Sequence, residues 1–338
     1  MQVSVETTGT VERRLTIGVP KEHIKPKIQN RLQSLANQTK FNGFRPGKVP
    51  MRVVEQRYGE KVREEIFSEV LQSSFSEAIT QEKLYPVGDP NFDFQSDIKK
   101  IEDGLSYVAV FEIYPDIPPL KVDSFAIEKQ VTEITEADVD SMLDRLREQR
   151  KTSEDELPEM DADFIKSFGV EDGTVETLRI EARKNMESEL KYAVDAEVKN
   201  QLLDALLETN PIDVPNVLVQ QEAKYLLEGK LKNTPDLEVT ADMFKDEATK
   251  KVKIGFLVRE LIKEYKLEAP SDKVQKIINN LAVAYNMPEE TVKQYYSDKQ
   301  RLQEIESLVL EDEVVAFLLD KSNVTEKTSE FYKIIDNK

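Results

Sequence analysis

The first part of the chain turns at Phe41-Asn42-Gly43-Phe44-Arg45-Pro46-Gly47-Lys48-Val49-Pro50. Two glycines and two prolines in ten residues disfavour a regular helix or strand, so this stretch predicts a loop. Apolar residues recur at helical spacing on both sides of it, so we expect a tip held between two helices. The tip carries one aromatic ring and two cations, Phe44, Arg45 and Lys48, which suit docking into an apolar notch beside phosphate or carboxylate groups.

The charge around this tip differs from that of the remaining chain. From Lys21 to Arg63 the sequence has 11 basic and 3 acidic residues, a local net charge of +8. Residues 1–118 together have a net charge of −1, whereas residues 119–338 have a net charge of −17. A polyanionic partner at one end of the molecule accounts for this asymmetry, and so does a solvated pair of basic helices, so composition leaves both open.

The composition excludes several classes of protein. With 338 residues, 33% of them charged, the chain suits two or three domains rich in helix. It has no cysteine and one histidine, so we expect no disulfide, no metal site and no cofactor. No apolar run approaches about 20 residues, and the first residues lack a basic and an apolar segment, so we expect a cytoplasmic protein without a signal peptide or membrane span. No nucleotide-binding motif is present, so nothing indicates nucleotide hydrolysis.

Residues 1–115 predict an α+β domain. The expected strands and helices cover, in chain order, 2–8, 11–19, 21–40, 51–82, 92–98 and 106–114. We expect Gly88-Asp89-Pro90 to break the chain between the second helix and the strands that follow. The two helices would then pack on a small antiparallel sheet.

Residues 116–160 predict a segment that joins this domain to the rest. It begins as an extended, proline-rich linker and contains a short strand at 127–131. A helix follows up to about residue 150, and Thr135 and Asp138 are spaced to cap its first turn in the manner of a capping box.

Residues 161–338 predict an all-helical body and arms. One long helix is expected over 175–209, because apolar residues recur almost every four positions there. Further helices are expected at 215–232, 240–266, 271–286, 288–298 and 299–320. The end, 321–338, is polar and is expected to fray. The predicted fold is therefore a multi-domain chain, with an α+β N-terminal domain followed by an elongated, mostly α-helical arm domain.

The tip also carries a family resemblance. The pattern Gly43-Phe44-Arg45-x-Gly47-Lys48-x-Pro50, after a basic helix, resembles the ribosome-docking signature of bacterial trigger factor. The resemblance covers nearly the whole chain and includes 164–173 and 183–187. It implies that Gly43, Phe44, Arg45, Gly47 and Lys48 bind the ribosome, with Phe44 and Arg45 contacting the exit-side ribosomal protein and its RNA. Pro46 departs from the pattern, because the family often has a basic residue there.

The family implies a function as well. Trigger factors are ATP-independent chaperones of the bacterial cytoplasm that associate with the polypeptide exit of the large ribosomal subunit. They hold nascent or unfolded polypeptides, and they assist protein folding and export, with links to cell division. The resemblance therefore implies the ribosome and unfolded chains as partners of this protein.

One segment departs from the family. Trigger factors usually carry an inserted prolyl isomerase domain where this chain has only the short polar segment 151–160, with the junction near 151–156. We therefore expect no catalytic residues and no enzyme activity, although the family activity makes peptidyl-prolyl isomerisation an alternative function. The abrupt junction favours a deletion over a natural loss.

The arms offer candidate binding residues. Apolar stripes at helical spacing usually pack helix against helix, so core packing is the alternative for each of them. A chaperone, however, needs apolar side chains that line an open cradle for unfolded chains. A dimeric scaffold without client binding, formed through the tip of the N-terminal domain, is a further alternative. The residues that we expect to contact clients are Met186, Leu190, Tyr192, Leu226, Met287, Tyr295, Tyr296 and Phe317.

Overall fold

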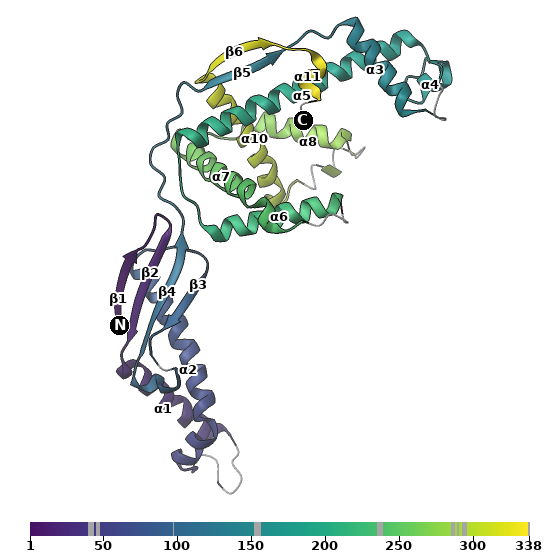
Figure 1. Cartoon of the computed structure of the whole chain (residues 1–338). Coiled ribbons are helices and arrows are strands. Elements are labelled where there is room, and N and C mark those ends of the chain that lie inside the picture. Colours follow the sequence, from purple (N-terminus) through teal and green to yellow (C-terminus); the bar gives the residue numbers. More distant parts are fainter. Residues whose placement is uncertain are drawn as a thin grey trace. The chain divides into compact units, whose positions relative to one another are not determined.

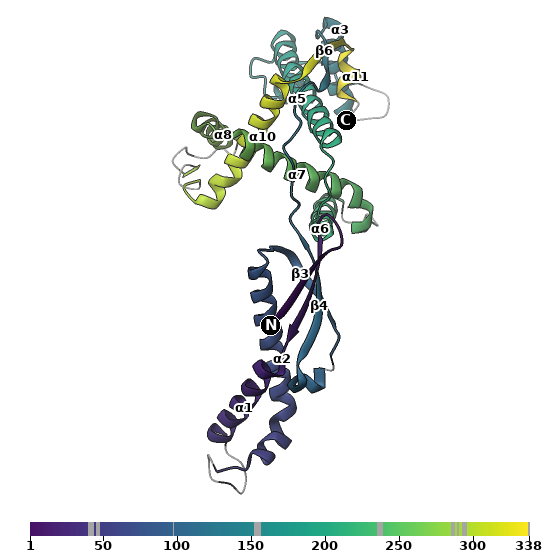
Figure 2. The same cartoon turned by 90° about the vertical axis from the view of Figure 1, so that its left-hand side faces the viewer.

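The computed structural model forms two compact units. It describes residues 1–39, 44, 48–96, 98–151, 157–234, 239–284, 288, 291–292 and 296–336. The first unit comprises Met1–Pro118 and Ile212–Gly255, and the second comprises Pro119–Pro211 and Phe256–Lys338 (Figure 1, Figure 2). This division differs from the predicted domains 1–115, 116–160 and 161–338, because a central part of the expected arms belongs to the first unit.

The first unit begins with the predicted α+β arrangement. Its elements are β1 (Gln2–Thr7), β2 (Glu12–Val19), α1 (Lys21–Gln38), α2 (Met51–Gln81), β3 (Pro86–Phe94), the 3-10 helix η1 (Ile98–Asp103) and β4 (Leu105–Ile113). The strands form one antiparallel sheet in the order β1-β2-β4-β3. The hairpin, the two helices and the last strand confirm the sequence predictions, and the helices pack on the sheet as expected (Figure 1).

The core of this domain follows the two periodicities of the sequence. α1 buries every fourth residue from Ile24 to Ala36, and β2 buries alternate residues such as Ile17. The inner strand β4 buries Tyr107 and the two residues that follow it. The Tyr107 hydroxyl group lies 2.8 Å from the Ser74 hydroxyl group, and burial raises the pKa of Tyr107. Both buried hydroxyl groups are thus satisfied inside an apolar core.

Two local expectations for this domain are wrong. Gly88-Asp89-Pro90 does not break the strand, because a register shift between Val87 and Asn91 absorbs these residues within β3. Gly88 has φ +77°, which glycine adopts without strain. Ile98 begins a 3-10 helix and is not part of a strand.

Helix α6 belongs to the first unit and is held by the sheet. The remaining elements of this unit are α6 (Asn216–Asn233), η2 (Ala241–Phe244) and the first half of α7 (Lys245–Tyr265). The N-cap of α6 is Pro215, whose side chain makes no capping hydrogen bond. The Glu112 carboxylate of β4 accepts instead from the backbone N–H groups of Asn216 at 2.9 Å and Val217 at 3.0 Å. A sheet residue thus stabilises the start of this helix.

The second unit contains the predicted long helix and the predicted capping box. Its elements are β5 (Ala126–Val131), α3 (Glu136–Gln149), α4 (Ala162–Lys166), α5 (Val175–Thr209), the rest of α7, α8 (Ser271–Ala284), α10 (Lys299–Asp320), β6 (Asn323–Thr328) and α11 (Phe331–Ile335). The capping box of Thr135 and Asp138 is confirmed, and Asp161 accepts from the backbone N–H of Phe164 at 2.8 Å. The predicted helix 288–298 lies largely outside the described residues.

The C-terminal segment corrects the prediction of a fraying end and of an all-helical region up to residue 338. Strand β6 pairs with β5 in parallel, from Ala126↔Asn323 to Val131↔Thr328. Phe331 of α11 is buried among residues of α3 and α5, including Leu143 and Met186. The polar residues of β6 are all exposed, so their composition resembles that of a free tail although their backbone is paired.

Candidate functional site

The tip of the first unit is anchored at its base. α1 ends at Gln38, and the backbone N–H of Thr39 donates to the Leu35 carbonyl group at 2.9 Å. Val49 is buried in the domain core immediately before α2 begins. Phe44 is 41% exposed and Lys48 is exposed, whereas Gly43, Arg45 and Gly47 lie outside the described residues. The described part of the tip therefore presents an aromatic ring and a cation to solvent.

Two ion pairs join the helices beneath the tip. The Lys27 amino group lies 2.7 Å from the Glu69 carboxylate, and the Arg31 guanidinium group lies 2.9 Å from the Glu65 carboxylate. Exposed pairs of this kind contribute at most about 1 kcal/mol each, so their main effect is to fix the spacing of α1 and α2. Further basic side chains of this segment remain exposed, namely Lys21, Lys25, Lys48, Arg52 and Lys61. Of these, Lys48 and Arg52 lie at the base of the tip, while Lys21, Lys25 and Lys61 lie further along α1 and α2.

The proposed client residues of α5 divide into three kinds of environment. Met186 is fully buried in the core formed with α3 and α11, so the prediction that it binds clients is wrong. Leu190 is half-buried against the same core. Tyr192 is 70% exposed. The four-residue spacing of the stripe drifts around a helix of 3.6 residues per turn, and Met186 lies where the stripe meets its packing partners.

The other described candidates also contribute to cores. Leu226 is half-buried against the α6–α7 core, and Tyr296 against the core of α8 and α10. Phe317 is half-buried, with its ring centroid 4.5 Å from that of Tyr265. Met287 and Tyr295 lie outside the described residues. The half-buried residues offer only part of their surface to a ligand.

Several exposed apolar residues were missed. Periodicity identifies the stripe that packs, whereas a binding surface is made by apolar residues that lie off that stripe. The sequence does carry one signal for such residues, namely an apolar side chain at a helix position that does not belong to the regularly spaced apolar stripe. The large apolar residues of this kind that the structure exposes are Ile180, Tyr225, Met243, Val283 and Leu308.

Arginines of α5 attach helix α3 to it. Arg179 and Arg183 pair with Glu136 at 2.6 and 2.5 Å, Arg179 also pairs with Asp140, and Arg183 donates to the Ile134 carbonyl group at 2.8 Å. The hydrogen bond from Arg179 and the nearby charge of Arg183 lower the pKa of the Glu136 carboxyl group. The ion pairs of Glu136 therefore stabilise the folded second unit at neutral pH. This contribution to the free energy of unfolding is lost as the pH falls through the lowered pKa of Glu136. These charges hold the unit together and do not form an acid–base pair.

The described residues show neither a metal centre nor a transmembrane helix. No group of three or more His, Cys, Asp or Glu side chains among them is arranged to hold a metal ion. Among the described residues, every helix is too short or too polar to span a lipid bilayer. An exposed ring and cation on a tip, together with helices that expose apolar residues, are typical of the class of proteins that bind other macromolecules.

Comparison with known families identifies this class more closely. Residues 1–146 match the family model described as bacterial trigger factor protein (TF), and residues 174–320 match that of the bacterial trigger factor protein C-terminus. The chain belongs to the trigger factor family and is a molecular chaperone. The short stretch 147–173 between the two matches contains the junction where the sequence predicts that the isomerase domain is missing.

Curated relatives support the same assignment. The trigger factor of Pseudoalteromonas atlantica is 36% identical over 439 aligned positions, covering 99% of each chain. That of Azotobacter vinelandii is 34% identical, covering 99% of this chain and 98% of its own. Because 439 aligned positions exceed the 338 residues of this chain, the first relative contains a long segment that is absent here.

A solved structure shares the fold. It is titled "Promiscuous Substrate Recognition in Folding and Assembly Activities of the Trigger Factor Chaperone". The two structures align with a TM-score of 0.56 and 16% sequence identity, over 95% of this chain and 100% of the other. This similarity confirms the predicted multi-domain fold.

Proposed function

We propose that this chaperone docks on the large ribosomal subunit through its tip and holds emerging, unfolded polypeptides on exposed apolar side chains. The observation that carries the proposal is an exposed Phe44 on a tip anchored by Val49, within a strongly basic segment of an otherwise acidic chain. The family supports the ribosome as the polyanionic partner. Apolar contact needs no nucleotide, so binding and release are driven by the affinity of each client.

Client holding depends on the apolar side chains that lie off the packing stripes. Each exposed ring or aliphatic group that a client covers contributes about 25 cal/mol per Å² of buried apolar area, before ordering costs. The double substitution Ile180→Ser and Tyr225→Ser removes two such groups without opening a core. We expect it to raise the chaperone concentration needed for half-suppression of the aggregation of an unfolded protein by about three- to tenfold.

A matched variant separates this effect from changes in folding. Lys184→Ser alters an exposed polar position of α5 and should leave suppression unchanged. Equal suppression by the parental chain and the double variant would contradict the assignment of Ile180 and Tyr225. Absence of suppression by the parental chain would contradict the proposed function itself.

The chain is proposed to act without prolyl isomerase activity. Residues 147–173 between the two family matches are too few to form an isomerase domain. Uncatalysed isomerisation takes tens to hundreds of seconds at 25 °C. We expect the rate of a proline-limited refolding reaction to be unchanged by catalytic amounts of this chain. An acceleration proportional to its concentration would show that isomerisation is encoded elsewhere in the sequence.

A further inference from the structure

One edge of strand β5 in the second unit already binds an amide group. The side chain of Gln201 in α5 accepts from the backbone N–H of Glu128 at 2.9 Å and donates to the Glu128 carbonyl group at 2.9 Å. This reciprocal pair reproduces the hydrogen bonding of a neighbouring strand. The edge of β5 that faces α5 is therefore able to recognise an amide.

The next position on this edge is Gln130. In the parallel ladder, Asn323 donates to the Phe125 carbonyl group and Ser329 donates to the Val131 carbonyl group, so odd-numbered residues of β5 face β6. Glu128 and Gln130 consequently direct their backbone groups to the opposite edge. Gln201 occupies this edge at Glu128, and no described residue is seen to bond the backbone of Gln130 there.

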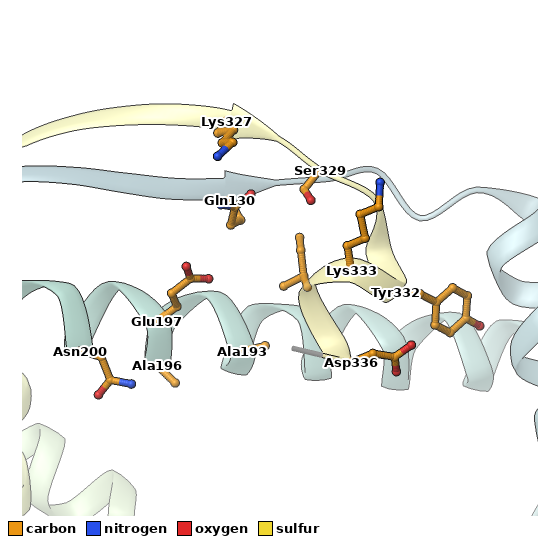
Figure 3. A pocket seen from close by; sticks show the side chains of 11 residues that line it. Gln130, Ala193, Ala196, Glu197, Asn200, Lys327, Ser329, Tyr332, Lys333 and Asp336 are labelled. Atoms are coloured by element: carbon orange, nitrogen blue, oxygen red, sulfur yellow. The ribbon is translucent and has the colours of Figure 1, made fainter. Parts of the chain in front are cut away.

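A cavity of about 920 Å³ opens beside Gln130 (Figure 3). Two residues along a strand cover about 6.6 Å and one helical turn about 5.4 Å, so Glu197, one turn before Gln201, lies opposite Gln130. Ala193 and Ala196 of α5 line the cavity and leave room between helix and strand, and α11 contributes Lys333 to its lining. The space has the dimensions of a ligand site and is bordered by a strand edge.

Three ionic groups at the cavity, Lys327, Lys333 and Asp336, are paired with neighbours. The Lys327 amino group lies 2.8 Å from the Glu128 carboxylate, and the Asp336 carboxylate lies 3.3 Å from the Arg145 guanidinium group. Lys333 lies 3.4 Å from Glu330. Glu197 also lines the cavity, where its carboxylate accepts a hydrogen bond from the Gln201 side-chain amide at 3.4 Å. Since the other lining charges are paired within the protein and Gln201 already binds this strand edge through an amide, the cavity suits the neutral amides of a polypeptide backbone.

We propose that this cavity binds an extended polypeptide segment, which adds to the edge of β5 at Gln130 by main-chain hydrogen bonds. The inference rests on the proposed function, because the occupant is a stretch of an unfolded client. Main-chain pairing supplies affinity that does not depend on side-chain identity, which matches a chaperone with diverse clients. Main-chain pairing at β5 would thus add hydrogen bonds to the apolar contacts through which the chaperone is proposed to hold its clients.

The test uses substitutions that alter the place where the peptide would bind, at Gln130 and in the cavity, and that leave the pairing of β5 with β6 intact. Gln130→Pro removes a backbone N–H that faces away from β6, where proline is tolerated in an edge strand. Ala196→Trp fills the cavity from α5. The probe is a fluorescent peptide of alternating Val and Thr with terminal lysines, and its affinity is measured by anisotropy. We expect each variant to raise the Kd about tenfold or more.

Three controls make the outcome specific. Gln130→Ala removes only the side chain and should change the Kd less than twofold. Glu187→Trp places the same ring on an exposed position of α5 that does not line the cavity, and it should bind the peptide as the parental chain does. A peptide N-methylated at every internal amide lacks main-chain donors on both edges, and it should bind the parental chain as weakly as the unmodified peptide binds Gln130→Pro.

The proposal is overturned if Gln130→Pro and Ala196→Trp bind the peptide like the parental chain, or if N-methylation has no effect. If the parental chain suppresses aggregation while these variants leave peptide affinity unchanged, only the cavity assignment fails. If the parental chain neither suppresses aggregation nor binds the peptide, the proposed function fails with it. Circular dichroism and the thermal midpoint show whether each variant is folded, and Ala196→Trp does not alter the strand.

Discussion

Replacing both Phe44 and Arg45 by alanine is expected to weaken ribosome binding by about 100-fold. Phe44 is exposed on an anchored tip, and burying its ring at a docking site contributes about 1.5–3 kcal/mol. The family resemblance assigns Arg45 a contact with ribosomal protein or RNA, and one charge-assisted hydrogen bond contributes about 1.5–3 kcal/mol. The lower ends of these two ranges sum to about 3 kcal/mol, which corresponds to the predicted loss. Cosedimentation with purified ribosomes at fixed salt would measure it.

The two single substitutions should differ in their salt dependence. We expect Arg45 to contact one phosphate group, so Arg45→Ala should reduce the slope of log K against log salt by about one. Phe44→Ala should lower affinity without changing that slope, because apolar contact releases no counterions. Tyr85→Ala is the matched control, since Tyr85 is an exposed aromatic residue beyond the far end of the 31-residue helix α2, about 45 Å along the helix. Retained binding by the Phe44 variant would contradict the docking role of the tip.

Elements with local signals were predicted well. The bounds of α5 follow from the recurrence of apolar residues and the prolines that end it, and the capping box at Thr135 follows from spacing alone. The tip is expected from its residue types alone, because glycine permits positive φ and proline fixes φ wherever they occur, but most of its residues lie outside the described part of the chain. These features depend on residues within one or two turns of one another, so a single sequence is enough to identify them.

Features that depend on distant partners were missed. Strand β6 exists because β5, almost 200 residues earlier, offers a free edge, and its exposed polar side chains give no sign of that pairing. The start of α6 is capped by Glu112 from another element, so its own N-cap sequence is uninformative. The register shift in β3 is defined by its pairing with β4, so it cannot be predicted from the residues of β3 alone.

The candidate client residues show the same limit. Met186 and Tyr192 lie on one helix six positions apart, and composition does not distinguish them. Met186 faces α3 and α11 and is buried, whereas Tyr192 points away from that core and is exposed. Exposure is decided by the helix that packs alongside. A binding surface made of exposed residues is therefore the part of the site that a single sequence specifies least.

Phe331 at the C-terminal end should be among the most important residues for the stability of the second unit. It is 1% exposed, and its ring packs edge-on against Tyr332 with centroids 5.1 Å apart. It fills the core that joins α3 to α5, beside Val139 and Leu178. We expect Phe331→Ala to lower the free energy of unfolding of this unit by about 3–5 kcal/mol, because the cavity that it leaves adds to the lost transfer free energy.

Graded variants of the same segment make this prediction specific. For a unit of this size, about 3 kcal/mol corresponds to a fall of about 6–12 °C in the melting temperature, which calorimetry resolves. Tyr332→Phe removes only the hydrogen bond of 3.0 Å to the Asp138 carbonyl group and should cost about 1 kcal/mol. Val324→Ala, on the exposed face of β6, should cost less than about 0.5 kcal/mol. If Phe331→Ala melted together with Val324→Ala, α11 would not be part of the cooperative core, and the C-terminal residues would be free to fray as their composition suggests.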